Sequence, residues 1–197
     1  MPRVTVQFKD KKVRAALRRL ERTMPGVAQR AVNRTLPKVR TTASQEVREL
    51  RNLPASFVKR QIKVLKASRR ARITAKIYSY TTAPPVERFK GTRMVRARGR
   101  ARRGQQRQTL GVQLEVIPGQ RHVLANAYIT PSGQVYDRGR SGAQRPRRLF
   151  GPSVATAMRK PEVSRAMQRR ASVEFPREID AQLRRQIARA GLKGRGR

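Results

Sequence analysis

Residues 27–50 read VAQRAVNRTLPKVRTTASQEVREL, and this stretch carries the strongest helical pattern in the chain. Apolar and small side chains recur there at steps of three and four, which places them on one face of an α-helix. They are Val27, Ala28, Ala31, Val32, Thr35, Leu36, Val39, Ala43, Val47 and Leu50. The opposite face carries Arg30, Arg34, Lys38, Arg40 and Arg48. Because proline lacks an N–H and crowds the preceding turn, we expect Pro37 to kink this helix or split it near Leu36.

Shorter elements are expected on both sides of this helix. Alternation over residues 3–8 predicts a strand, and a short helix with Asp10 as its N-cap should follow and break at Pro25-Gly26. Asn52 is a candidate cap for a further helix over 57–66, with Phe57, Val58, Ile62 and Leu65 inward. Alternating Ala71, Ile73, Ala75 and Ile77 predict a strand over 71–79.

The second half of the sequence reads as a small sheet followed by helices. Strands over 110–116 and 123–129 flank Pro118-Gly119 as an antiparallel hairpin, and residues 134–137 form a third strand. Helices are expected over 153–158, after Pro161, and from Pro176 to Gly191. The fold class is therefore α+β, with N- and C-terminal helices around a small antiparallel sheet that carries long arginine-rich loops.

We expect a single domain over residues 1–197. Its parts would be a helical part at about 10–67, the sheet with its basic loops at about 71–148, C-terminal helices at about 151–191 and a basic tail at 192–197. Leu, Ile, Val and Phe together make up 42 of the 197 residues, so the hydrophobic core should be thin.

The charge of the chain is its most unusual property. Lys and Arg total 49 against 11 Asp and Glu, which gives a formal net charge of +38, and 38 of the 49 cations are arginine. Arginine binds phosphates and carboxylates through two parallel hydrogen bonds and is less strongly hydrated than lysine. The composition therefore favours contact with a polyanion or with acidic protein surfaces.

Two loops concentrate these cations, at 88–107 and 138–148. The candidate contact residues are Arg88, Lys90, Arg93, Arg96, Arg98, Arg100, Arg102, Arg103, Arg107, Arg138, Arg140, Arg145, Arg147 and Arg148. Such loops can follow a phosphate backbone without reading sequence. The alternatives are solvated arms, or arms that pack against acidic faces of a partner protein.

Catalytic and cofactor chemistry is poorly supported by the sequence. There is no cysteine, His122 is the single histidine, and the carboxylates form no metal-ligand pattern with it. Phosphate-binding glycine loops are absent, and no apolar run is long enough to span a membrane. Glu174, Glu178 and Asp180 read as stabilising the start of the last helix. We therefore expect no enzyme, no cofactor, no metal and no membrane contact. A ribosomal protein, a nucleoid protein and a virion component all remain open at this point.

The order of segments resembles the phage minor tail protein Z family, also called tail completion proteins. The residues that carry the resemblance are Pro25-Gly26-Val27-Ala28, Arg30-Ala31-Val32-Asn33-Arg34-Thr35, the helix around Lys59–Lys66, Ala71-Arg72-Ile73, Arg138, Leu149-Phe150-Gly151-Pro152-Ser153 and Phe175-Pro176-Arg177-Glu178. The likeness extends over most of residues 10–190. It lies in the order and general residue character of the segments more than in strict sequence identity.

This resemblance implies a structural protein at the head-proximal end of a long phage tail. It implies that the protein completes the tail for joining to the head, with the tail terminator, tube and connector as partners. A homo-oligomeric ring, contact with genomic double-stranded DNA and assembly in the host cytoplasm are further expectations. The alternative is a ribosomal or other nucleic-acid-packing protein that binds the phosphate backbone.

Overall fold

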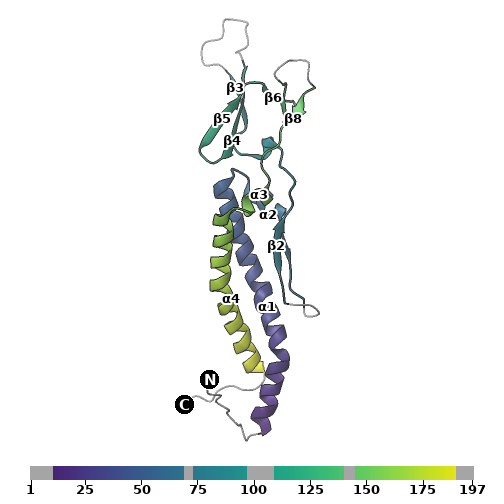
Figure 1. Ribbon diagram of the computed structural model, residues 1–197, viewed down its shortest axis with the longest axis vertical. Coiled ribbons are helices and arrows are strands. Elements are labelled where there is room, and N and C mark those ends of the chain that lie inside the picture. The colour runs from purple at the N-terminus through teal and green to yellow at the C-terminus, as the bar shows by residue number, and fades with distance from the viewer. Residues whose placement is uncertain (1–10, 69–72, 97–108, 140–144, 190–197) are drawn as a thin grey trace. The chain divides into compact units, whose positions relative to one another are not determined.

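The computed structural model describes residues 11–68, 73–96, 109–139 and 145–189, with side chains described from residue 24 onward. The expected strand over 3–8 and the Asp10 cap lie outside these residues. The chain divides into two compact units. The helical unit comprises Met1–Val39, Val64–Ile77 and Gln168–Arg197, and the sheet unit comprises Arg40–Lys63 and Tyr78–Met167. The secondary structure confirms the α+β class (Figure 1).

Helix α1 (Lys11–Leu50) is continuous through both Pro25 and Pro37. The expected break at Pro25-Gly26 and the expected split near Leu36 are therefore wrong. Val27, Ala31 and Val47 are fully or almost fully buried along the helix, whereas Pro37 lies exposed. Burial of this apolar face outweighs the one backbone hydrogen bond that each proline removes.

Helix α4 (Pro161–Arg189) is also continuous, with Pro176 exposed in its interior. Two separate helices divided at Pro176 were expected, and that expectation is wrong. Glu174 and Glu178 consequently lie in the middle of a helix and do not stabilise an N-terminal turn. Ile187 near the end of this helix is 38% exposed.

In the helical unit, the first part of α1 and the last part of α4 lie side by side (Figure 1). Lys38 on α1 binds Glu174 and Glu178 on α4, at 2.7 and 2.8 Å from its Nζ. Asn33 on α1 holds a neighbouring segment in place. Its Nδ2 donates to the Ala67 carbonyl at 3.1 Å, and its Oδ1 accepts from the Ala67 N–H at 2.8 Å.

Helix α2 (Ala55–Gln61) ends earlier than the sequence pattern suggested. Residues Ile62–Leu65 form strand β1, which pairs with β2 (Lys76–Ser79) in a two-stranded sheet. Ile62 and Val64 are β-branched and favour the extended chain over a further helical turn. Pro54, and not Asn52, occupies the N-cap position of α2.

Other predictions in this region need correction as well. The helix expected over 57–66 stops at Gln61, and Leu65, expected to be inward, is 55% exposed. The strand expected over 71–79 is confirmed only over 76–79; residues 73–75 are not part of a strand, and 71–72 fall outside the described ranges.

The sheet unit contains two three-stranded antiparallel sheets. One has the order β3-β4-β5 and the other the order β6-β7-β8. Their bounds are β3 (Arg93–Arg96), β4 (Thr109–Ile117), β5 (Gln120–Leu124), β6 (Ala127–Ile129), β7 (Val135–Asp137) and β8 (Arg147–Arg148).

The predicted hairpin and third strand are confirmed as β4–β5 and β7. Gln113 pairs with Val123, and Gly119 turns the chain with a φ of 81°. The single strand expected over 123–129 is instead two strands in different sheets, divided by a turn at Ala125-Asn126.

Two short strands lie where only basic loop was expected. β3 occupies part of the 88–107 segment and β8 part of the 138–148 segment. Met94 and Val95 pair with Val112 and Gly111, so two apolar residues within the cationic run are enough to add a strand to β4.

The core of the sheet unit includes Val86, Val112, Leu114, Ala127 and Val135. The 3₁₀ turn η1 (Val86–Arg88) supplies the first of these residues. The short helix expected from Ser153 is confirmed as α3 (Val154–Met158), with the Ser153 Oγ accepting from the Thr156 N–H at 3.2 Å. Ser153 therefore acts as the N-cap.

Candidate functional site

Eight of the fourteen predicted contact residues lie in the described part of the chain, and all eight belong to the sheet unit. They are Arg88, Lys90, Arg93, Arg96, Arg138, Arg145, Arg147 and Arg148. The other six, Arg98, Arg100, Arg102, Arg103, Arg107 and Arg140, lie outside it. All of the eight are exposed except Arg148, which is half-buried.

The backbone of Arg88, Arg93 and Arg96 is fixed in short secondary-structure elements, whereas their side chains are exposed. Arg88 ends η1, while Arg93 and Arg96 on β3 pair with Gln113 and Thr109. None of these three guanidinium groups forms a hydrogen bond or an ion pair with the described residues. Each can therefore bind a phosphate or a carboxylate without first losing an internal partner.

Lys90 is fixed through its backbone. Its N–H donates to the Asn52 carbonyl at 2.9 Å, and its carbonyl accepts from Asn52 Nδ2 at 3.1 Å. This leaves the Lys90 side chain exposed. Asn52 therefore positions a loop, where the sequence had suggested a helix cap.

Arg138 and Arg148 contact aromatic rings around the second sheet. The Arg138 guanidinium lies 4.9 Å from the centre of the Tyr128 ring, and Tyr128 stacks on Tyr136 at 6.1 Å. Such cation–π contacts contribute about 0.5–1 kcal/mol at exposed sites and restrict the guanidinium orientation.

Arg148 already has internal partners. Its Nη2 binds Glu87, and its guanidinium lies 5.8 Å from the centre of the Phe150 ring. Arg148 is thus the one member of the described set whose charge is neutralised within the unit. Its neighbour Arg147 lies opposite Asp137 in the backbone register of strands β7 and β8, and the Arg147 side chain is exposed.

Glu115 stabilises the β4–β5 hairpin. Its Oε1 accepts from the Gly119 N–H at 2.9 Å and its Oε2 from Arg121 Nε at 3.3 Å. These contacts, the Gly119 N–H first, lower the pKa of the Glu115 carboxyl below its ordinary value of 4.5. A carboxyl held in its ionised form stabilises structure and is a poor general acid.

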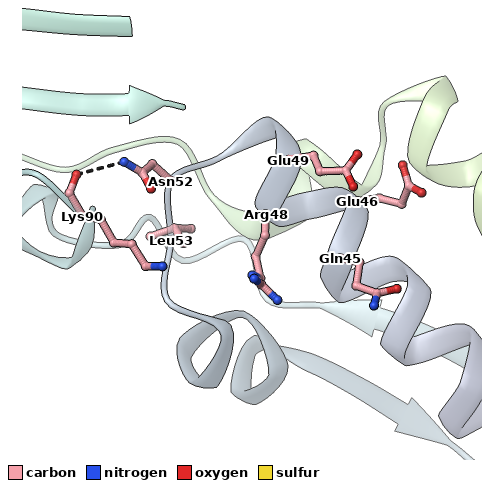
Figure 2. Close-up of a pocket in the computed structure, with 7 residues that line it drawn as sticks. All are labelled: Gln45, Glu46, Arg48, Glu49, Asn52, Leu53 and Lys90. Carbon is pink, nitrogen blue, oxygen red and sulfur yellow. Dashed lines mark hydrogen bonds between the residues drawn. The ribbon is translucent and has the colours of Figure 1, made fainter. Parts of the chain in front are cut away.

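An open polar cavity of about 480 Å³ lies at the C-terminal end of α1 (Figure 2). Its lining residues are Gln45, Glu46, Arg48, Glu49, Asn52, Leu53 and Lys90. Glu46 and Glu49 form no ion pair with the described residues. Because the cavity mixes both signs of charge and lacks an apolar wall, it does not resemble a small-molecule site.

The described residues contain no group of three or more His, Cys, Asp or Glu side chains that could hold a metal ion. Within the same ranges, no helix is both long and apolar enough to cross a membrane. His122 lies exposed on β5.

The arginines of α4 were not among the predicted contact residues, because the prediction placed those residues only in loops. Six of them belong to the helical unit and are exposed: Arg169, Arg170, Arg177, Arg184, Arg185 and Arg189. Their recurrence at helical spacing was the available signal.

The fold and these surfaces define a strongly basic α+β protein whose arginines face solvent on small sheets and on a long helix. Residues 10–189 match the family model described as prophage minor tail protein Z (GPZ). The chain belongs to this family and is a structural protein of the phage tail, with other tail proteins as partners and the virion tail as its location. Neither the curated proteins nor the solved structures that were searched gave a match.

Proposed function

We propose that this protein completes the head-proximal end of the tail, so that the tail can join the head. Membership of the minor tail protein Z family over residues 10–189 is the observation that carries the proposal. In this role the protein is structural and performs no catalysis. It is assembled in the host cytoplasm, and its neighbours are the tail terminator, the tube and the connector.

A closed ring of identical chains is the geometry that suits a tube end. Several copies around the tube would bring their cationic surfaces to one place, facing either double-stranded DNA or acidic rims of adjacent rings. Arg88, Arg93 and Arg96 support this arrangement because their side chains are exposed and have no partner among the described residues. The six candidate arginines outside the described ranges are proposed to extend the same surface.

Deletion of the gene from the phage, followed by complementation, tests this role. Lysates without the protein should contain filled heads and separate tails, counted by negative-stain electron microscopy. Wild-type protein should restore joined particles. Normal numbers of infectious, head-joined particles without the protein would overturn the proposal.

A charge variant tests the cationic surface in the same assay. Arg88→Gln, Arg93→Gln and Arg96→Gln together should restore fewer joined particles than the wild type does. The matched control is Lys59→Gln, Arg60→Gln and Lys160→Gln, which removes the same charge from exposed positions elsewhere in the sheet unit. Equal performance of the two variants would show that this part of the surface makes no specific contact.

A further inference from the structure

One face of α4 in the helical unit is fully occupied by contacts within that unit. Glu174, which is buried, binds Lys38 on α1 at 2.7 Å and Arg170 on its own helix at 3.0 Å. Glu178 binds the same lysine at 2.8 Å. The buried Gln182 amide oxygen, in the orientation that satisfies both amide atoms, accepts from Arg34 Nε and Arg185 Nη1. These contacts fix which side of α4 faces α1.

An adjoining face of α4 carries three arginines that these contacts leave largely available. Arg169 and Arg184 are exposed and have no side-chain partner among the described residues. Arg177 has a side chain 72% exposed and only a long contact of 3.9 Å to Glu174. At 3.6 residues per turn the three positions fall within an arc of about 80°, and they follow one another at roughly 12 and 10 Å along the axis.

Few other groups on this face compete with the arginines. Asp180 is its single carboxylate in the helical unit, and Val173 and Ile187 are the exposed apolar residues. Among the carboxylates of the unit whose side chains the structure describes, Glu174 and Glu178 already bind Lys38. Apart from Asp180 and the long contact of Arg177 to Glu174, the described side chains of the unit offer the arginines of this face no carboxylate, so the face can bind a partner of opposite charge.

We propose that this face of α4, defined by Arg169, Arg177 and Arg184, binds the phosphate backbone of double-stranded DNA. The inference rests on the proposed role at the tail end and adds a second surface to the cationic sheets. Three arginines in a row on a rigid helix suit a regular line of phosphates. The face has no exposed aromatic side chain, so stacking on single-stranded bases does not account for it. Two separated apolar residues are too few for the buried core of a protein interface.

The test measures binding of the full chain to a short duplex of arbitrary sequence by fluorescence anisotropy over a series of salt concentrations. Three variants are compared with the wild type. The first changes Arg169, Arg177 and Arg184 to Gln, the second changes Arg88, Arg93 and Arg96 to Gln, and the third changes Lys59, Arg60 and Lys160 to Gln.

The first variant should bind less tightly, with a log affinity against log salt slope shallower by about 2 to 3, because each lost phosphate contact contributes roughly 0.9. The third variant should stay close to the wild type. Asp180→Asn should act in the opposite direction and tighten binding, since it removes the only carboxylate of the face. Circular dichroism of each variant checks that the helices are intact.

The outcomes separate this inference from the proposed function. If the first and third variants lose affinity equally, net charge alone governs binding and the inference is overturned. A loss confined to the second variant also overturns it, but leaves the DNA contact of the sheet unit standing. If the wild type does not bind duplex DNA at all, the α4 inference fails, while the role in joining, tested by complementation, stands independently.

Discussion

Gly151 is required because an aromatic ring lies directly against it. A Cβ at this position would lie 2.3 Å from Cε2 and 2.6 Å from Cζ of Phe89, and Phe89 is almost completely buried. The Gly151 N–H donates to the Pro84 carbonyl at 2.8 Å, so the backbone has little freedom to move away. The segment Leu149–Ser153 carried part of the family resemblance. Packing against Phe89 explains why this segment has a glycine at position 151.

We predict that Gly151→Ala destabilises the sheet unit by about 1–3 kcal/mol, the usual cost of overpacking a core. Chemical denaturation of the full chain measures the change. Phe89→Leu provides the control, because a smaller side chain gives the new methyl group room. The double variant should lose less stability than the two single losses added together. Additive losses would contradict the account of Gly151.

Lys38 and Glu174 stabilise the helical unit in a pH-dependent way. The hydrogen bond from Lys38 Nζ lowers the pKa of the Glu174 carboxyl below its ordinary value of 4.5. The same bond, followed by that to Glu178, raises the pKa of Lys38 above 10.5. The carboxylate contribution is therefore present above pH 4.5 and lost as the pH falls through the lowered pKa, and the lysine contribution is lost only above pH 10.5.

Glu174→Gln should lower the melting temperature at neutral pH. The difference from the wild type should shrink as the pH falls below 4.5, because the native carboxyl then becomes neutral as well. Thermal melts followed by circular dichroism over this range measure it. Glu49→Gln is the control, since Glu49 is exposed and has no ion pair with the described residues. A difference in melting temperature that does not change with pH would show that the charge of Glu174 does not contribute to stability.

At the residue scale, the sequence was informative where a single side chain makes a local contact. Ser153 followed by a short helical pattern predicted the start of α3 correctly. Asn52 had the same apparent role but instead binds the backbone of Lys90, 38 residues away. A partner so distant in the sequence leaves no local pattern, and for this reason the position of Lys90 could not be predicted.

Interior prolines are the main source of error at the scale of elements. Pro25 and Pro37 in α1 and Pro176 in α4 all lie inside continuous helices. Local propensity predicts an interruption at each of them, whereas around Pro37 the buried residues on both sides, among them Ala31 and Ala43, share one helix face. Tertiary burial decided the outcome, and its strength cannot be read from a single sequence.

We predict that Pro37→Ala stabilises the protein, by up to about 3 kcal/mol, because alanine restores a backbone N–H inside α1 and removes the clash with the preceding turn. Denaturation in urea measures the change. Pro54→Ala is the matched control: Pro54 is the N-cap of α2, where no interior hydrogen bond is missing, so no comparable gain is expected. A loss of stability in Pro37→Ala would mean that the proline ring itself makes a required contact.

Strand β3 shows a different limit of sequence reasoning. Arginines surround Met94 and Val95, so composition indicated a loop, yet these two residues pair with β4. Pairing depends on the position of β4, and the sequence of residues 88–107 does not contain that information. The hairpin β4–β5 was predictable because both strands and their Pro118-Gly119 turn are adjacent in the chain.

For the molecule as a whole, charge and family membership point to the same class of function. A net charge of +38 indicates a polyanionic or acidic partner, and membership of the minor tail protein Z family places the chain in a phage tail. The sequence predicted the class, the α+β fold and the cationic surface of the sheet unit. It did not predict the arginines on α4, because the contact residues were assigned only to the two loops in which cations are concentrated.

The most direct test of the central claim is the position of the protein in the virion. Purified phage particles labelled with a gold-conjugated antibody against this protein would be examined by electron microscopy. We expect label at the junction between head and tail, and at one end only of tails that have not joined a head. Label along the tail shaft or at its distal tip would contradict it.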